Sequence, residues 1–295
     1  MKSRLGARAG VRELVLFTAP ALILILVTTD VPFLMNVFYA FRNWNGISKV
    51  SRFVGFRNFT ELFTDDKGFF TATLFTAKYT LLFVVLVNVA ALLLSLVLVR
   101  ALASRNLLRA VFYLPNIIST VVVSFIWRFI FGTGFEALGA STGWAVFRLS
   151  WLGDARLAFL VIVMVSLWQS IGFYMVVYVA GLVSIPTDIR DASIIDGARG
   201  LQKFARVDLP LLMPSVTVCV FFSLISALKV FDLVFVLTSG GPYGSTISVA
   251  LDIYTEAFRN SRYGYGTAKS LVFFLAILLV TVIQVRFFKS REIEI

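Results

Sequence analysis

The sequence of 295 residues contains no histidine and a single cysteine. Without histidine there is no imidazole for acid–base catalysis or metal binding, and one cysteine supports neither a disulfide framework nor a cysteine-rich zinc site. Charged residues are scarce as well, at 15% against about 25% in an ordinary soluble domain. We therefore expect no catalytic residues, no metal site and no cofactor held by this chain, and a water-soluble domain is excluded.

Apolar residues are abundant: they make up 59% of the chain, with 30 phenylalanines and a mean hydropathy of +0.90. A helix needs about 20 mostly apolar residues to cross the hydrocarbon core of a bilayer. Such runs predict an all-α, polytopic membrane protein with six transmembrane helices and both chain ends on one side. The six runs are Leu14–Ala40, Thr73–Val99, Leu107–Phe131, Leu157–Val183, Leu211–Thr238 and Thr267–Phe288.

The first run carries two kinds of interruption. Pro20 and Pro32 lie inside it, and Thr28, Thr29 and Asp30 are polar, so we expect a helix that is kinked or ends early. Basic residues precede the run, as in a signal peptide. The run is longer than a signal core of about 7 to 15 residues, and five further runs follow, so we expect it to stay in the mature chain.

The net charge of +11 does not predict nucleic-acid binding, because the basic residues lie between apolar runs and form no single basic face. Their distribution instead sets the orientation. With both termini cytoplasmic, the inner segments hold 14 Lys and Arg and the outer segments nine. We expect a cytoplasmic segment over residues 1–13, a transmembrane domain over 14–289 and a cytoplasmic tail over 290–295.

The connection over residues 185–210 differs from the others. It holds eight charged residues, four of each sign, with apolar residues at helical spacing between them. We expect two short helices separated by a turn at Asp196–Gly197, with Pro210 ending the second. Two interpretations of its apolar stripe stay open: packing on the membrane or on the chain's own helices, or docking of a cytoplasmic partner.

This connection resembles the cytoplasmic signature loop of ABC importer permeases. The match consists of Asp191-Ala192-Ser193, then Asp196-Gly197-Ala198, then Leu209-Pro210. A second block, with Leu237–Pro242 (LTSGGP) and Tyr263–Ala268 (YGYGTA), is similar to the region flanking the last two spans in carbohydrate importers of the maltose and glycerol-phosphate type. The resemblance extends from about Leu74 to the C-terminus.

The resemblance implies the type I ABC importer permease fold and alternating access driven by separate ATPases. The expected partners are two copies of an ATP-binding subunit, which hold ATP and Mg, a second and non-identical permease, and an extracytoplasmic sugar-binding protein. The expected location is the inner membrane of a prokaryote, in contact with lipid. A cytoplasmic coupling helix is implied, with contact residues at Asp191, Ala192, Ser193, Asp196, Gly197, Ala198, Leu201, Phe204 and Pro210.

Passage of a sugar needs polar and aromatic groups within the spans, because the solute's lost water must be replaced. Each candidate has a structural alternative: the amide, the hydroxyls and the aromatics could simply bridge or pack helices, and Lys229 could pair with Asp232 on one helix face. Lys78 and Arg128 lie nearer span ends, where we expect snorkelling. The candidates for the substrate path are Asn88, Trp168, Gln169, Tyr174, Ser226, Lys229, Phe231 and Asp232.

Other functions remain as alternatives. The first is an ABC permease for a non-sugar solute such as glycerol-phosphate, a polyamine or an amino acid, and the second is a secondary transporter. An intramembrane enzyme would need a nucleophile, base or metal set that the spans do not supply.

Overall fold

The computed structural model describes residues 15–100 and 103–292. The chain divides into two compact units, one made of Met1–Asp66 and Ile253–Phe273, the other of Lys67–Asp252 and Phe274–Ile295. Nearly every element is helical, which confirms the all-α prediction. Within the described residues the exception is an antiparallel hairpin of two short strands, β1 (Arg42–Asn43) and β2 (Arg52–Phe53). The predicted segment 1–13 lies outside the described residues.

Five helices in the described part of the chain are long and apolar enough to cross a membrane, and a bent pair makes up to six. The second, fourth and sixth predicted runs agree with their helices to within two turns. Six spans therefore remain a prediction, because the sixth depends on counting the bent pair as one. The five helices are Val15–Ala40, Lys67–Leu98, Thr120–Thr142, Ala155–Ser184 and Tyr263–Lys289, and the pair is Gly200–Leu211 with Met213–Leu228, bent by 72°.

The prediction of one span over Leu107–Phe131 is wrong. The structure has an amphipathic helix, α5 (Arg105–Ile117), and a separate helix, α6 (Thr120–Phe129), joined by Ile118 in an extended conformation. Pro115 in the last turn of α5 removes a backbone donor, and the helix ends shortly after it. Since apolar residues continue across the break, hydropathy alone could not reveal it.

The fifth run is also interrupted. Helix α12 (Met213–Leu228) ends at Lys229, and a short helix, α13 (Asp232–Leu237), begins after Phe231. In the first run the expected early end is wrong: the helix continues from Val15 to Ala40. The polar residues lie in a π-helical turn, η1 (Leu26–Asp30), followed by α2 (Val31–Ala40).

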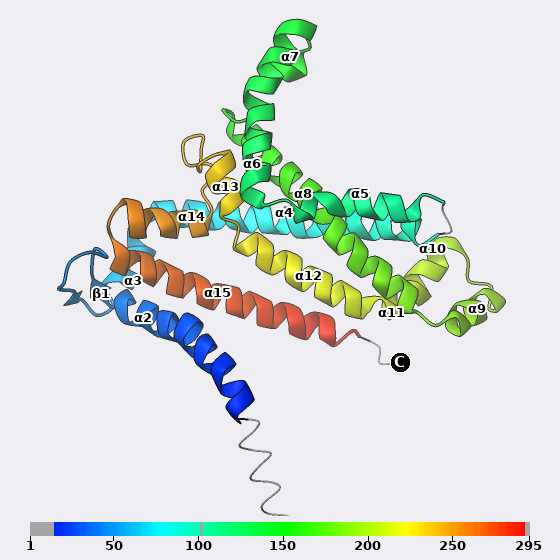
Figure 1. Cartoon of the computed structure of the whole chain (residues 1–295), viewed down its shortest axis with the longest axis horizontal. Helices are drawn as coiled ribbons and strands as arrows, with labels where there is room; N and C mark the ends of the chain where they lie inside the picture. Colours follow the sequence, from blue (N-terminus) through cyan, green and yellow to red (C-terminus); the bar gives the residue numbers. More distant parts are fainter. Residues whose placement is uncertain (1–14, 101–102, 293–295) are drawn as a thin grey trace, which may run out of the picture. The chain divides into compact units, whose positions relative to one another are not determined.

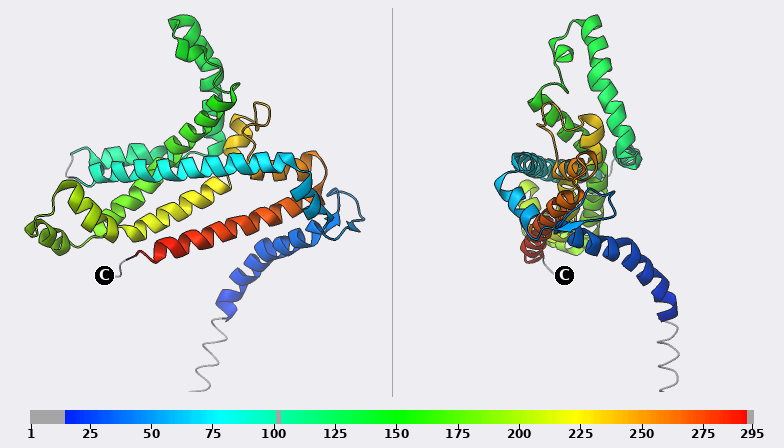
Figure 2. Two further views of the ribbon diagram at one scale, coloured as in Figure 1. Left: turned by 180° about the vertical axis from the view of Figure 1, so that it is seen from behind. Right: turned by 90° about the vertical axis from the view of Figure 1, so that its left-hand side faces the viewer.

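The larger unit is built around three packed helices, α4 (Lys67–Leu98), α8 (Ala155–Ser184) and α12 (Figures 1 and 2). Small residues let their neighbours approach: a Cβ on Gly172 would lie 2.0 Å from the Phe112 carbonyl oxygen of α5, and one on Gly181 would lie 2.0 Å from Ser215 Oγ. Helix α6 continues through η2 (Ile130–Gly134) into α7 (Phe135–Thr142), which projects away from the three helices (Figure 1).

The smaller unit is held by polar contacts around the start of the last helix, α15 (Tyr263–Lys289). Asn58 of α3 (Arg57–Thr64) donates to the carbonyl oxygens of Ala40 at 2.8 Å and Arg42 at 3.0 Å. Lys269 is fully buried, and its Nζ lies 2.7 Å from Asp66 Oδ2 and 3.8 Å from Glu256 Oε1. This buried lysine falls inside the sixth predicted run, and no local pattern predicts its role because its partners lie in other segments.

The remaining elements connect these helices. They are η3 (Ala145–Arg148), α9 (Thr187–Ile195), α10 (Gly200–Lys203), η4 (Phe204–Asp208), α11 (Leu209–Leu211), α14 (Val249–Tyr254) and η5 (Thr255–Arg259).

Candidate functional site

A cavity of about 180 Å³ lies where the breaks in the third and fifth runs meet α4 and α8. Two helix breaks create it, since each break turns polar backbone and side chains toward the space that a straight helix would fill. Most of its lining side chains are polar or aromatic. They are Tyr79, Phe83, Thr120, Ser166, Gln169, Ser170, Ser226, Lys229, Val230, Phe231, Asp232 and Leu233.

Five of the eight predicted path residues line this cavity: Gln169, Ser226, Lys229, Phe231 and Asp232. Lys229 and Asp232 stand on either side of the break between α12 and α13, and both are exposed. No ion pair joins their side chains in the described part of the chain, which argues against the structural alternative of a pair on one helix face. Both charges are available to a solute in the cavity.

Gln169 stabilises the break between α5 and α6. Its Nε2 donates to the Ile118 carbonyl oxygen at 3.0 Å and to Thr120 Oγ1 at 3.2 Å. The side chain thus satisfies backbone that the end of α5 leaves without a helical partner. Gln169 Oε1 is left to accept a hydrogen bond from the cavity side.

Several lining residues are not among the sequence-based candidates. Tyr79 donates to Ser166 Oγ at 2.8 Å, and Ser166 donates to the Ile162 carbonyl oxygen at 2.7 Å. Ser166 and Ser170 flank Gln169 at positions that share a helix face. That spacing was the available signal, but serines are common between membrane helices and carry little information alone.

Three predicted path residues do not line the cavity. Asn88 bridges helices: it donates to Ser223 Oγ at 2.9 Å and accepts from the Tyr178 hydroxyl at 2.7 Å. Tyr174 is buried with 3% of its surface exposed. Trp168 is 42% exposed and packs edge-on against Trp127, with 5.5 Å between ring centroids.

A second candidate site is the connection between α8 and α12, which contains the expected helices. Helix α9 ends in a Schellman motif: Ala198 N donates to the Ser193 carbonyl oxygen at 2.9 Å and Gly197 N to that of Ile194 at 3.0 Å. Gly197 takes φ +83°, as the Asp-Gly turn predicted. The second segment continues through α10, η4 and α11 to Leu211, one residue beyond the predicted end at Pro210.

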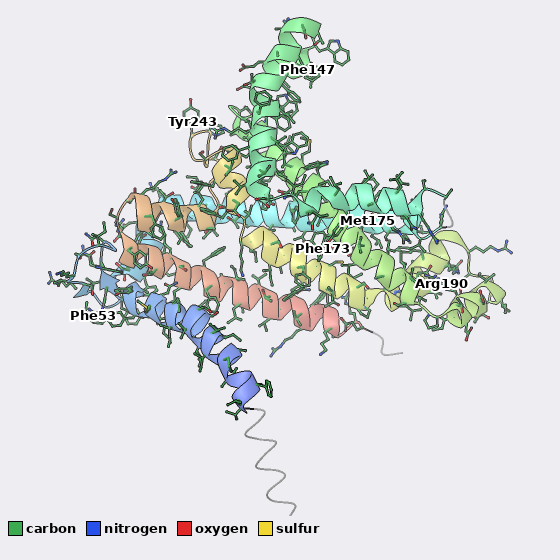
Figure 3. The ribbon with its side chains drawn as sticks, viewed as in Figure 1. Phe53, Phe147, Phe173, Met175, Arg190 and Tyr243 are labelled. Carbon is green, nitrogen blue, oxygen red and sulfur yellow. The ribbon has the colours of Figure 1, made fainter. Side chains whose placement is uncertain are left out.

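Arg190 fixes this connection to the helical unit, and it was not predicted. Its Nη2 donates to the Leu182 carbonyl oxygen at 2.8 Å, at the end of α8, and its Nε lies 3.3 Å from Asp208 Oδ1 in η4. Figure 3 shows Arg190 where α9 joins the rest of the unit. The opposite charges near the two ends of the segment were visible in the sequence, but their pairing depends on how the chain folds back.

The predicted contact residues of this connection divide by exposure. Ser193 is buried, with Oγ donating to the Arg190 carbonyl oxygen at 2.6 Å. Ile195 is 86% exposed and Leu201 81% exposed, so the apolar stripe is not covered by the described part of this chain. The other predicted residues are exposed or half-buried: Asp191, Ala192, Asp196 and Gly197 are exposed, and Ala198, Phe204 and Pro210 are half-buried.

Like Lys78, Arg128 is exposed. Its Nη1 donates to the Val236 carbonyl oxygen at 3.1 Å, near the end of α13. The arginine therefore satisfies a carbonyl group near a helix end, and the snorkelling expected for Arg128 and Lys78 remains a prediction.

The structure combines several membrane-spanning helices, a polar cavity between helices, and a folded segment with exposed apolar residues at one end. This is the architecture of a membrane transport protein that binds other subunits. The chain belongs to the family of binding-protein-dependent transport system inner membrane components, which its residues 88–292 match. It is thus a multi-pass inner-membrane permease component.

Relatives agree with this family. The chain is 39% identical over 281 residues to the probable starch degradation products transport system permease protein AmyD of Thermoanaerobacterium thermosulfurigenes, covering 95% of this chain and 94% of that one. It is 36% identical over 277 residues to the multiple sugar-binding transport system permease protein MsmF of Streptococcus mutans, covering 94% and 95%. A trehalose/maltose transport system permease protein, MalF of Thermococcus litoralis, is 31% identical over 81% of each chain.

The fold is shared with solved structures. A bacterial ABC transporter involved in import of the acidic polysaccharide alginate aligns with a TM-score of 0.81 over 97% of this chain and 99% of that chain, at 21% identity. The same kind of transporter, solved with an alginate pentasaccharide-bound periplasmic protein, gives 0.79 at 22% identity over 94% of each chain.

Proposed function

We propose that this chain is one of two permease subunits in an ATP-driven importer that takes a sugar or oligosaccharide from an extracytoplasmic binding protein and releases it into the cytoplasm. The observation that carries the proposal is the coupling segment 185–210, anchored by Arg190 yet presenting exposed Ile195 and Leu201. Exposed apolar side chains on a fixed element indicate docking of a protein partner.

The energy source is a separate subunit. The sequence has no G-x-x-x-x-G-K-[ST] segment to cradle nucleotide phosphates. Two ATP-binding subunits, which hold ATP and Mg, dock on this segment and its counterpart in the second permease. In this orientation both termini are cytoplasmic, as the excess of basic residues in the inner segments supports.

The solute class is supported by the relatives and by the cavity. The three named relatives belong to starch-product, multiple-sugar and trehalose/maltose systems. The cavity offers hydroxyls, an amide and the ring of Phe231, together with one cation and one carboxylate. Such groups replace the hydration of a polyol and stack on its apolar face.

A second, non-identical permease completes the path. The cavity of about 180 Å³ is smaller than the roughly 300–1,000 Å³ of typical ligand pockets. The second subunit would supply the facing half and thereby contribute to the choice of sugar.

Purification of the tagged chain from its native membranes tests the assembly. We expect an ATP-binding subunit with a phosphate-binding loop and a second permease to co-purify. Leu201→Asp should remove most of the ATP-binding subunit, because it places a charge in an apolar contact, and should leave the second permease bound. Ile47→Asp, at a residue that is 84% exposed in the first outer segment, is the matched control. A chain that purifies alone, with uptake intact, contradicts the proposal.

A further inference from the structure

A groove of about 520 Å³ lies between the N-terminal parts of α4 and α8 and shares no lining residue with the cavity of about 180 Å³. Phe75 of α4 meets Phe159 of α8 edge-on, with 5.8 Å between ring centroids. The lining residues of α4 recur at helical spacing and therefore lie on one face of that helix, and the same holds for those of α8. The lining residues are Thr71, Leu74, Phe75, Lys78, Ala155, Arg156, Phe159, Leu160 and Ser245.

The groove is positively charged. Lys78 and Arg156 line it, and both are exposed. Neither side chain has an ion-pair partner within residues 15–100 and 103–292. The nearby Asp154 caps α8 by accepting from the backbone N–H groups of Arg156 and Leu157 at 2.9 and 3.0 Å, and none of the described lining residues carries a carboxylate.

The groove also holds an unpaired donor. Ser245 Oγ is buried and has no hydrogen-bond partner in the described part of the chain. A buried hydroxyl without a partner is costly. Ser245 lines the same groove as the cations Lys78 and Arg156. All three groups donate hydrogen bonds, so together they match a ligand rich in acceptor oxygens.

The depth of Lys78 indicates where that ligand comes from. Lys78 lies about three turns beyond Lys67, where α4 begins, so it is roughly 16 Å along the helix axis from the first residue. A lysine that faces outward within a membrane-spanning helix needs an anionic partner or water at the interface. Leu74, Phe75, Phe159 and Leu160 form the apolar walls of the same groove.

We propose that this groove binds an anionic phospholipid. The phosphate lies between the Lys78 ammonium and the Arg156 guanidinium, with the Ser245 hydroxyl as a further donor, and one acyl chain follows the apolar walls. Two cations in an apolar groove between membrane helices fit an anionic lipid headgroup, to which both can donate charge-assisted hydrogen bonds.

Native mass spectrometry of the purified full-length complex, offered equal amounts of phosphatidylglycerol and phosphatidylcholine, tests the proposal. We expect the wild type to retain at least about tenfold more phosphatidylglycerol, and K78Q/R156Q to lose that preference. The matched control is K49Q/R52Q, which removes two exposed basic residues from the first outer segment. Equal retention of both lipids by the wild type, or equal losses in the two variants, overturns the proposal.

Labelling of lysines in the wild type gives a readout that does not depend on a variant's folding. Phosphatidylglycerol should lower the reactivity of Lys78 toward an amine-reactive ester at least about fivefold, without changing that of Lys49. Soluble glycerol phosphate should not protect Lys78; equal protection by it would assign a small-anion site instead of a lipid site. Loss of the second permease from K78Q/R156Q with lipid retention unchanged would assign a protein interface and also overturn the proposal.

Discussion

Replacing Gly197 with valine is expected to reduce uptake to less than about one tenth and to abolish the ATP hydrolysis that depends on binding protein. Gly197 closes the Schellman motif of α9 with φ +83°, a conformation that costs an ordinary L-residue roughly 1–2 kcal/mol and a β-branched residue more. A Cβ at this position would meet no atom within 4 Å. The damage therefore comes from backbone strain at the end of the coupling helix, and not from a clash in the membrane domain.

The controls for Gly197→Val separate backbone strain from loss of the permease. Gly197→Asn should keep most of the uptake, because asparagine tolerates the left-handed region. Gly132→Ala, at a helical glycine whose Cβ would also meet nothing within 4 Å, should be neutral. Membrane levels should be unchanged in all three variants by immunoblotting. Wild-type uptake by Gly197→Val would show that the α9 turn does not couple ATP hydrolysis to transport.

Removing either charge from the substrate cavity, by Lys229→Met or Asp232→Asn, should lower uptake roughly 10- to 100-fold. A hydrogen bond to a charged group contributes about 1.5–3 kcal/mol, which is a factor of about that size. Both side chains line the cavity and neither is paired with the other, so a sugar would use them directly. ATP hydrolysis stimulated by binding protein should persist, because the coupling segment is untouched.

Lys49→Met and Asp65→Asn are the matched controls for the cavity variants, since both residues are exposed in the first outer segment. Radiolabelled sugar uptake at several concentrations distinguishes the effects: loss of a sugar contact raises the half-saturating concentration or lowers the maximal rate, with the ATPase rate preserved. Equal losses of uptake and ATPase activity in the cavity variants would show that the two charges support helix packing and do not contact the sugar.

The sequence was informative where a local rule decides the structure. The turn at Asp196–Gly197 followed from glycine's freedom at positive φ, and the second, fourth and sixth spans followed from hydropathy. It was uninformative where the hydrogen-bonding groups of the backbone are satisfied by a side chain far away in the sequence. The break at Ile118 is stabilised by Gln169, 51 residues away, and no local sequence pattern predicts such a partner.

The candidate site shows the same division. Lys229 and Asp232 were found because charge inside a span is rare. The alternative that they pair on one helix face assumed a continuous helix, which the break before α13 interrupts. Asn88 was chosen as a polar group within a span, but its side chain hydrogen-bonds to Ser223 and Tyr178 of neighbouring helices. Arg190 and Lys269 were missed because their partners are remote in sequence, so only the folded chain brings them together.

Uptake by the purified complex in proteoliposomes tests the central claim most directly. With ATP inside and a sugar-loaded binding protein outside, labelled sugar should accumulate on the ATP side only when both are present. Omitting either ATP or the binding protein should abolish accumulation, and proton and sodium gradients without ATP should have no effect. Accumulation driven by an ion gradient in the absence of ATP would contradict the account.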